Sequence, residues 1–101
     1  MANTFKRYKV EGVTTETVIT TAQEGTEITV IGMTVANVGT SEASISLKHG
    51  TTHMLKNAPI LVGSAMVPIG GEQKVVLEAG DTFSVTSDVA VDVILSVLEK
   101  S

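Results

Sequence analysis

The chain has 101 residues, no cysteine and a formal net charge of −4. A chain of this length forms a single domain, residues 1–101, around one hydrophobic core. The absence of cysteine excludes a disulfide framework, a thiolate zinc site and a thiol nucleophile. The sequence has neither a signal-peptide pattern nor an apolar stretch near the ~20 residues that span a bilayer, so we expect a soluble protein that is made in the cytoplasm and does not act at a membrane.

Val, Ile and Thr account for 36 of the 101 residues and occur in short runs separated by Gly, Asn, Asp and Ser. β-Branched side chains pack well on a pleated sheet and lose rotamer freedom in a helix, and no window has a helical apolar period. The runs therefore predict an all-β fold: a single antiparallel β-sandwich, jelly-roll-like, with about eight strands. In chain order the extended segments are residues 5–10, 13–21, 26–38, 43–48, 53–57, 65–69, 73–78, 82–86 and 89–98.

Residues 1–9 are the basic part of an otherwise acidic chain. They hold three cations and a charge of +3, while the remainder has four lysines against eleven carboxylates, which is −7. A frayed terminus, or a first strand paired within its own sheet, would explain the segment. We hypothesise instead a basic arm outside the core that docks on a neighbouring copy or another protein. The candidate assembly interface is Phe5, Lys6, Arg7, Tyr8 and Lys9, with the two aromatic rings as apolar anchors. Nucleic-acid binding is not expected, because the acidic body repels phosphate and three cations release few counterions.

The segment 26–38 has the strongest strand pattern, with apolar residues alternating on two faces. Gly32 within it indicates a bulge or bend that could carry the strand from one sheet to the other. The last segment has apolar residues on both faces, which predicts a central strand. The residues expected in the core are Ile28, Val30, Leu47, Val75, Leu77, Phe83, Val85, Val93 and Leu95.

His49 and His53 flank a predicted hairpin loop and are the only histidines. A three-residue loop would oppose the two rings on one face, whereas a two-residue loop would pair His49 with Thr52 and send the rings to opposite sides. Pairing of Leu47 with Leu55 favours the three-residue loop. Two ligands are too few for a metal site and no third is evident, so we interpret both histidines as polar residues beside a loop and expect no bound metal.

The other polar residues give no catalytic pattern. Glu78, Asp81, Asp88 and Asp92 could converge at one end of the sandwich, but their spacing fits no calcium-binding loop. Solubilising turn carboxylates are the better interpretation. Ser64 has no G-x-S-x-G context and no evident base, and no glycine-rich phosphate loop is present. We therefore expect neither an enzyme nor a cofactor.

Three segments resemble a pattern in small virion proteins of tailed bacteriophages. They are residues 26–38 (TEITVIGMTVANV), the Ser/Ala/Thr-rich strand 39–47, and residues 69–85 (IGGEQKVVLEAGDTFSV). The resemblance covers most of residues 13–98, and its motifs are turns and strands that carry no catalysis. It implies a β-sandwich built into the particle in many copies, as a head-decoration, neck or tail-associated protein, and it defines no functional side chains.

On this resemblance, the expected function is that of a non-enzymatic virion structural protein that stabilises the particle. It would be synthesised in the host cytoplasm and located in the virion. The expected partners are further copies of itself, as a trimer or higher ring, and other virion proteins such as major capsid, portal or tail components. The alternative is a phage surface or fibre-associated module that adheres to host glycans; the small number of aromatic residues, three in all, counts against it.

Overall fold

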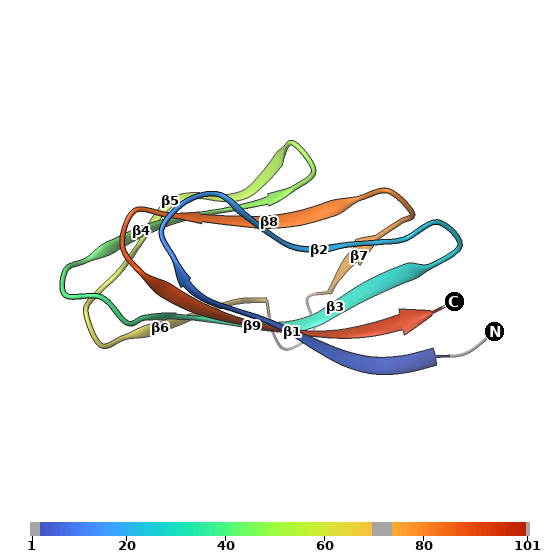
Figure 1. Ribbon diagram of the computed structural model, residues 1–101, viewed down its shortest axis with the longest axis horizontal. Coiled ribbons are helices and arrows are strands. Elements are labelled where there is room, and N and C mark those ends of the chain that lie inside the picture. The colour runs from blue at the N-terminus through green and yellow to red at the C-terminus, as the bar shows by residue number, and fades with distance from the viewer. Residues whose placement is uncertain (1–2, 70–73, 101) are drawn as a thin grey trace.

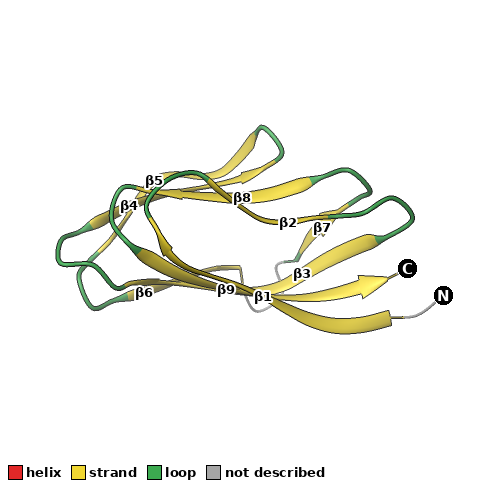
Figure 2. Cartoon of the chain, viewed as in Figure 1, coloured by secondary structure: helices red, strands yellow, loops and turns green. Residues whose placement is uncertain are grey.

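The regular elements of the described chain are β-strands. The computed structural model describes residues 3–69 and 74–100 (Figure 1). The strands are β1 (Asn3–Val13), β2 (Thr17–Thr21), β3 (Glu27–Asn37), β4 (Ala43–His49), β5 (Thr52–Ile60), β6 (Ala65–Ile69), β7 (Val75–Leu77), β8 (Thr82–Ser87) and β9 (Val91–Lys100). Figure 2 shows the loops and turns that join them. Within these two ranges no helix has the length and apolarity needed to cross a membrane.

The strands form two antiparallel sheets that pack face to face (Figure 1). Sheet A has the order β1-β9-β3-β6, with β7 also paired to β3, and sheet B has the order β2-β8-β4-β5. The pairings are nested: β1 with β9, β2 with β8, β3 with β6 and β7, and β4 with β5. An antiparallel ribbon folded over in this way, with the β4–β5 hairpin at its tip, is a jelly roll. The predicted fold class is therefore confirmed.

The core lies between the two sheets and follows the two-residue alternation of strand side chains. Eight of the nine predicted core residues are buried. The exception is Val75, which is half-buried because it belongs to the short edge strand β7, where it pairs with Val30. Along the central strand β9, every second residue from Val91 to Val97 is buried, as the alternation predicts.

β3 contains the bulge that Gly32 predicted. The register between β3 and β9 shifts between Val30 and Gly32. On its other side, β3 pairs with β7 as far as Val30 and with β6 from Met33 onwards, so the bulge lies where one edge strand replaces the other. β3 nevertheless stays in sheet A, because β9 runs beside it as far as Asn37. The expected passage from one sheet to the other does not occur.

The basic N-terminal segment is part of sheet A. Residues 3–9, expected to form an arm outside the core, lie in β1 and pair with β9 without interruption, from Asn3 opposite Lys100 to Val10 opposite Val93. This pairing satisfies backbone groups of β9 that would otherwise face solvent along an open edge. The segment is thus an edge strand of the sandwich, which corrects the boundary drawn after residue 9 and agrees with the alternative of a strand in its own sheet.

Asn37 ties two loops together at one end of the sandwich. Its buried side-chain amide donates to the backbone oxygens of Ser41 and Ile60, each at 2.9 Å, and its carbonyl oxygen accepts from Gly39 N at 2.9 Å. Its backbone N–H also donates to Ser64 O in the β5–β6 loop. A buried polar side chain whose bonds are all made fixes one arrangement of the surrounding backbone, so this end of the fold is held in place.

Candidate functional site

The outer face of sheet A carries a group of exposed apolar side chains. Phe5 is 75% exposed, Val67 65%, Ile94 48% and Val76 47%. They come from β1, β6, β9 and β7, and Leu98 lies opposite Phe5 across the β1–β9 pairing. Because the side chains stand on paired strands, their positions are fixed by the sheet. The face therefore presents apolar side chains at fixed positions, with Thr29 between Leu98 and Val76 and Ser96 between Ile94 and Leu98.

The five predicted interface residues divide between the two sides of β1, because successive side chains of a strand alternate. Phe5, Arg7 and Lys9 lie on the outer face of sheet A, each opposite an outward residue of β9. Lys6 and Tyr8 lie on the inner side, each opposite a buried residue of β9. The sequence predicted a single arm made of all five residues. In the structure three of them point outward from sheet A, and two point toward the space between the sheets.

The outer face of sheet B is polar. The residues Val18, Ser84, Lys48 and His53 stand in register across its four strands. Only the first of them is apolar, and Ser84 is 6% exposed, so the polar surface of this row comes from Lys48 and His53. Lys48 Nζ lies 2.8 Å from Glu16 Oε2. This hydrogen bond and the lysine charge lower the pKa of the exposed Glu16 carboxyl. Both side chains of this charge pair are partly exposed, so covering this face would remove their hydration and gain little.

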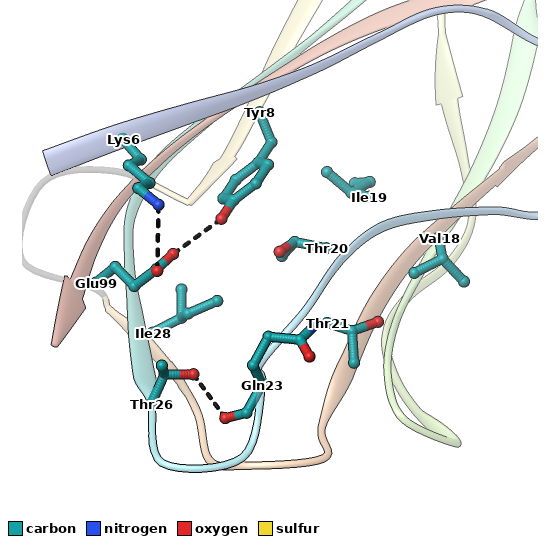
Figure 3. A pocket seen from close by; sticks show the side chains of 10 residues that line it. All are labelled: Lys6, Tyr8, Val18, Ile19, Thr20, Thr21, Gln23, Thr26, Ile28 and Glu99. Carbon is teal, nitrogen blue, oxygen red and sulfur yellow. Dashed lines mark hydrogen bonds and ion pairs between the residues drawn. The ribbon is translucent and has the colours of Figure 1, made fainter. Parts of the chain in front are cut away.

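A cleft of about 470 Å³ opens between the edge strands β1 and β2 (Figure 3). It is lined by Lys6 and Tyr8 from β1, residues 18–21 from β2, and further side chains that include Ile28 and Glu99. Glu99 Oε1 lies 3.3 Å from Lys6 Nζ, and Glu99 Oε2 accepts a 2.9 Å hydrogen bond from Tyr8 OH. Two residues of β1 and one from the end of β9 thus form one polar wall.

The two histidines do not face each other. β4 and β5 are joined by a two-residue loop, and His49 stands opposite Thr52. Leu47 does pair with Leu55, as predicted, but a bulge in β5 supplies the extra residue that a longer loop was expected to provide. His53 is exposed on the outer face of sheet B, so no shared histidine site forms.

The four carboxylates considered for a calcium site serve separate positions in the fold. Asp81 accepts a 2.9 Å hydrogen bond from Glu78 N and lies 3.7 Å from His49 Nε2. Asp88, beyond the other end of β8, accepts from a backbone N–H of β4, and Asp92 accepts from a backbone N–H of β1. The described residues contain no group of three or more His, Cys, Asp or Glu side chains placed to hold a metal ion. The four carboxylates do not converge at one end of the sandwich.

Glu99 and Ile94 were not assigned a role by the sequence, although the strand pattern held the signal for both. Every second side chain of β9 points inward, including Val93 and Val97, and Glu99 is the next residue on this inward side. A carboxylate in the inward phase indicates a polar group at the edge of the core. Ile94 lies on the opposite side of β9. The apolar residues on both sides predicted a central strand, which is confirmed because β9 lies between β1 and β3, and Ile94 itself is 48% exposed.

Comparison with known proteins gives no relative from which a role could be taken. No family model matches the chain, no curated protein matches it, and no solved structure matches it. The functional interpretation therefore rests on the geometry of the two outer faces and the cleft, together with the sequence resemblance given above.

Proposed function

We propose that this chain is a non-enzymatic bacteriophage virion structural protein, present in multiple copies as a capsid decoration or a neck- or tail-associated protein that stabilises the particle. The particle assignment comes from the resemblance over residues 13–98. The observation that carries the multi-copy role is the apolar outer face of sheet A, with the cations of β1 at its edge. The occupant we propose for this face is a second copy of the chain.

Burial of the exposed side chains favours association. Phe5, Val67, Val76 and Ile94 each expose about half or more of their surface, and covering apolar area contributes about 25 cal/mol per Å². A sandwich of this size buries a limited core on its own. Contacts with neighbouring copies would therefore add stability by mass action. The rigid sheet lowers the entropic cost, since little has to be ordered when the face is covered.

Charge indicates how the copies are arranged. β1 is an open edge with cations at positions 6, 7 and 9. Antiparallel pairing of β1 with its own copy would place like charges close together, which is unfavourable. The rest of the chain has a charge of −7, so the basic edge is better matched to a different, acidic surface of the next copy. A contact between two different surfaces closes into a ring when the rotation permits, and we therefore propose a trimer or higher ring.

Mass spectrometry of purified particles of the phage that encodes this chain tests the virion role. The proposal predicts the chain as a stoichiometric component, and its copy number would separate a decoration protein from a neck ring or a tail component. Absence of the chain from intact, infectious particles would refute the virion role whatever its oligomeric state.

A second candidate function, a phage surface module that adheres to host glycans, is favoured by one observation: the polar cleft between β1 and β2. The cleft lies on the inner side of β1, whereas the apolar face lies on its outer side. The cleft and the apolar face can therefore be altered separately by substitution.

A further inference from the structure

We propose that the cleft between β1 and β2 binds a neutral polyhydroxylated ligand of the size of one or two pyranose rings. The inference goes beyond the structural role proposed above and does not depend on it. The cleft lies on the side of the sandwich where β1, the edge of sheet A, and β2, the edge of sheet B, face each other. Side chains from both sheets therefore line a single hollow.

Size and rigidity suit a small ligand. The cleft measures about 470 Å³, within the range of about 300–1,000 Å³ that is usual for ligand sites. Most of its lining residues stand on strands, namely β1, β2, β3 and β9. The turn between β2 and β3 completes the rim, where Thr26 Oγ1 donates to Gln23 O at 2.6 Å. The polar groups are thus held in place before any ligand arrives, which reduces the entropy lost on binding.

The charges in the cleft are balanced. Among residues 3–69 and 74–100, Lys6 and Glu99 are the ionised residues that line it, and they pair with each other at 3.3 Å. Tyr8 OH donates to the second oxygen of the same carboxylate. An anionic ligand would compete with Glu99 for the lysine, and a cationic ligand would compete with Lys6 for the carboxylate. A neutral ligand can hydrogen-bond to the pair without separating it, so the geometry selects against charge.

The remaining lining is half polar and half apolar. Thr20 is only 7% exposed, and Figure 3 shows its hydroxyl turned toward the side where Tyr8 and Glu99 lie. Ile19 and Ile28 supply apolar surface to the same hollow. A pyranose ring presents hydroxyl groups around its rim and C–H groups on its faces, so it matches a site with both kinds of lining. Tyr8, the only tyrosine of the chain, adds an aromatic ring that can contact such a C–H face.

Titration of the ¹⁵N-labelled full chain with three neutral sugars, methyl α-glucoside, methyl β-galactoside and N-acetylglucosamine, tests the proposal. At least one should give saturable amide shifts at β1, β2 and the end of β9, with a dissociation constant in the range of about 1–10 mM expected for a small ligand with few contacts. No saturable shift with any of the three at about 50 mM, or shifts centred on another surface, would overturn the proposal.

Two variants assign the binding to the cleft. Thr20→Val and Tyr8→Phe each remove one hydroxyl at nearly unchanged shape, and each should weaken sugar binding about five-fold. Thr86→Val makes the same change as the first variant on the outer face of sheet B and should leave the affinity unchanged. Equal weakening by Thr20→Val and Thr86→Val would contradict the assignment, and the amide spectrum of each variant shows that it is folded. Oligomeric mass, which tests the role of the apolar face, is measured separately.

Discussion

The outer faces of the two sheets differ although both cover the same core. On sheet A, Phe5, Ile94 and Leu98 form an apolar surface with basic residues along its β1 edge. On sheet B, the corresponding positions of the central strand β8 are two hydroxyl residues, Ser84, which is buried, and Thr86, which is half-buried. Both sheets bury their inner residues equally well, so folding alone does not require the difference. The difference supports the proposal that a second copy covers the outer face of sheet A and leaves the outer face of sheet B uncovered.

The largest expected effect is on the free energy of unfolding, and it distinguishes two adjacent residues, one in the core and one on the outer face. Val93 is 1% exposed and Ile94 is 48% exposed. Val93→Asp places a charge without a partner in the core and should lower the free energy of unfolding by about 4 kcal/mol or more. Ile94→Asp should change it by less than ~0.5 kcal/mol when measured on dilute monomer. Urea unfolding followed by circular dichroism distinguishes them, and equal losses would mean that Ile94 belongs to the core and not to a free face.

A second substitution tests whether stability and association are separate properties. Asn37→Ala removes three side-chain hydrogen bonds to the loops at one end of the sandwich and should cost about 3 kcal/mol of unfolding free energy. Asn57→Gly is the control, because Asn57 has a φ of 53°, which glycine adopts without strain. Neither residue lies on the outer face of sheet A, so neither change should alter the association constant of folded protein. A loss of association in Asn37→Ala at a temperature where it is folded would place the interface at this end.

The basic edge should contribute less than the apolar face. The double substitution Arg7→Glu and Lys9→Glu reverses two exposed charges, each worth less than ~1 kcal/mol, and should weaken self-association at most about ten-fold at low salt. The difference from the unaltered protein should shrink in about 1 M NaCl, where screening is nearly complete. Lys56→Glu reverses a single charge on β5 of sheet B and should have no effect. An equal effect of Lys56→Glu would show that net charge, and not the edge, controls association.

The smallest expected effect concerns the ion pair on sheet B. The Lys48 ammonium lowers the pKa of Glu16, so the pair stabilises the fold above the pKa of the unfolded side chain, and this contribution is lost as the pH falls through the lower pKa of the folded state. A pH titration by NMR should give Glu16 an acid-shifted midpoint that moves back toward the ordinary glutamate pKa in Lys48→Met. An unchanged midpoint in Lys48→Met would mean that Lys48 does not interact with Glu16 in solution.

Local patterns predicted the sandwich well because strand periodicity is local. The alternation around Val93 and Leu95 identified buried positions before any pairing was known, and Gly32 marked a bulge that the register confirms. The β4–β5 loop shows where this reasoning stops. The pairing of Leu47 with Leu55 was correct, but it implied the wrong loop length, because the bulge in β5 falls at Met54, where no glycine marks it.

The outer face and the cleft could not be predicted from the sequence, because they are formed by residues that are far apart along the chain. Charge alone made residues 1–9 look like an arm, whereas β1 is fixed by pairing with β9, more than 80 positions further along the chain. The cleft joins Lys6 and Tyr8 to Thr20 and Glu99, and only the nested jelly-roll pairing brings them together. Which side chains of β1 point inward and which point outward can be assigned once β9 is known to be its partner strand.

Multi-angle light scattering of the purified protein at micromolar concentration tests the central claim most directly. The claim that copies associate through the outer face of sheet A predicts a mass of three or more chains for the unaltered protein and a monomer for Ile94→Asp. Val18→Asp, the equivalent change on the outer face of sheet B, should keep the mass of the unaltered protein. A strictly monomeric unaltered protein, both alone and mixed with its particle, or an Ile94→Asp variant that associates as strongly as the unaltered protein, would contradict the claim.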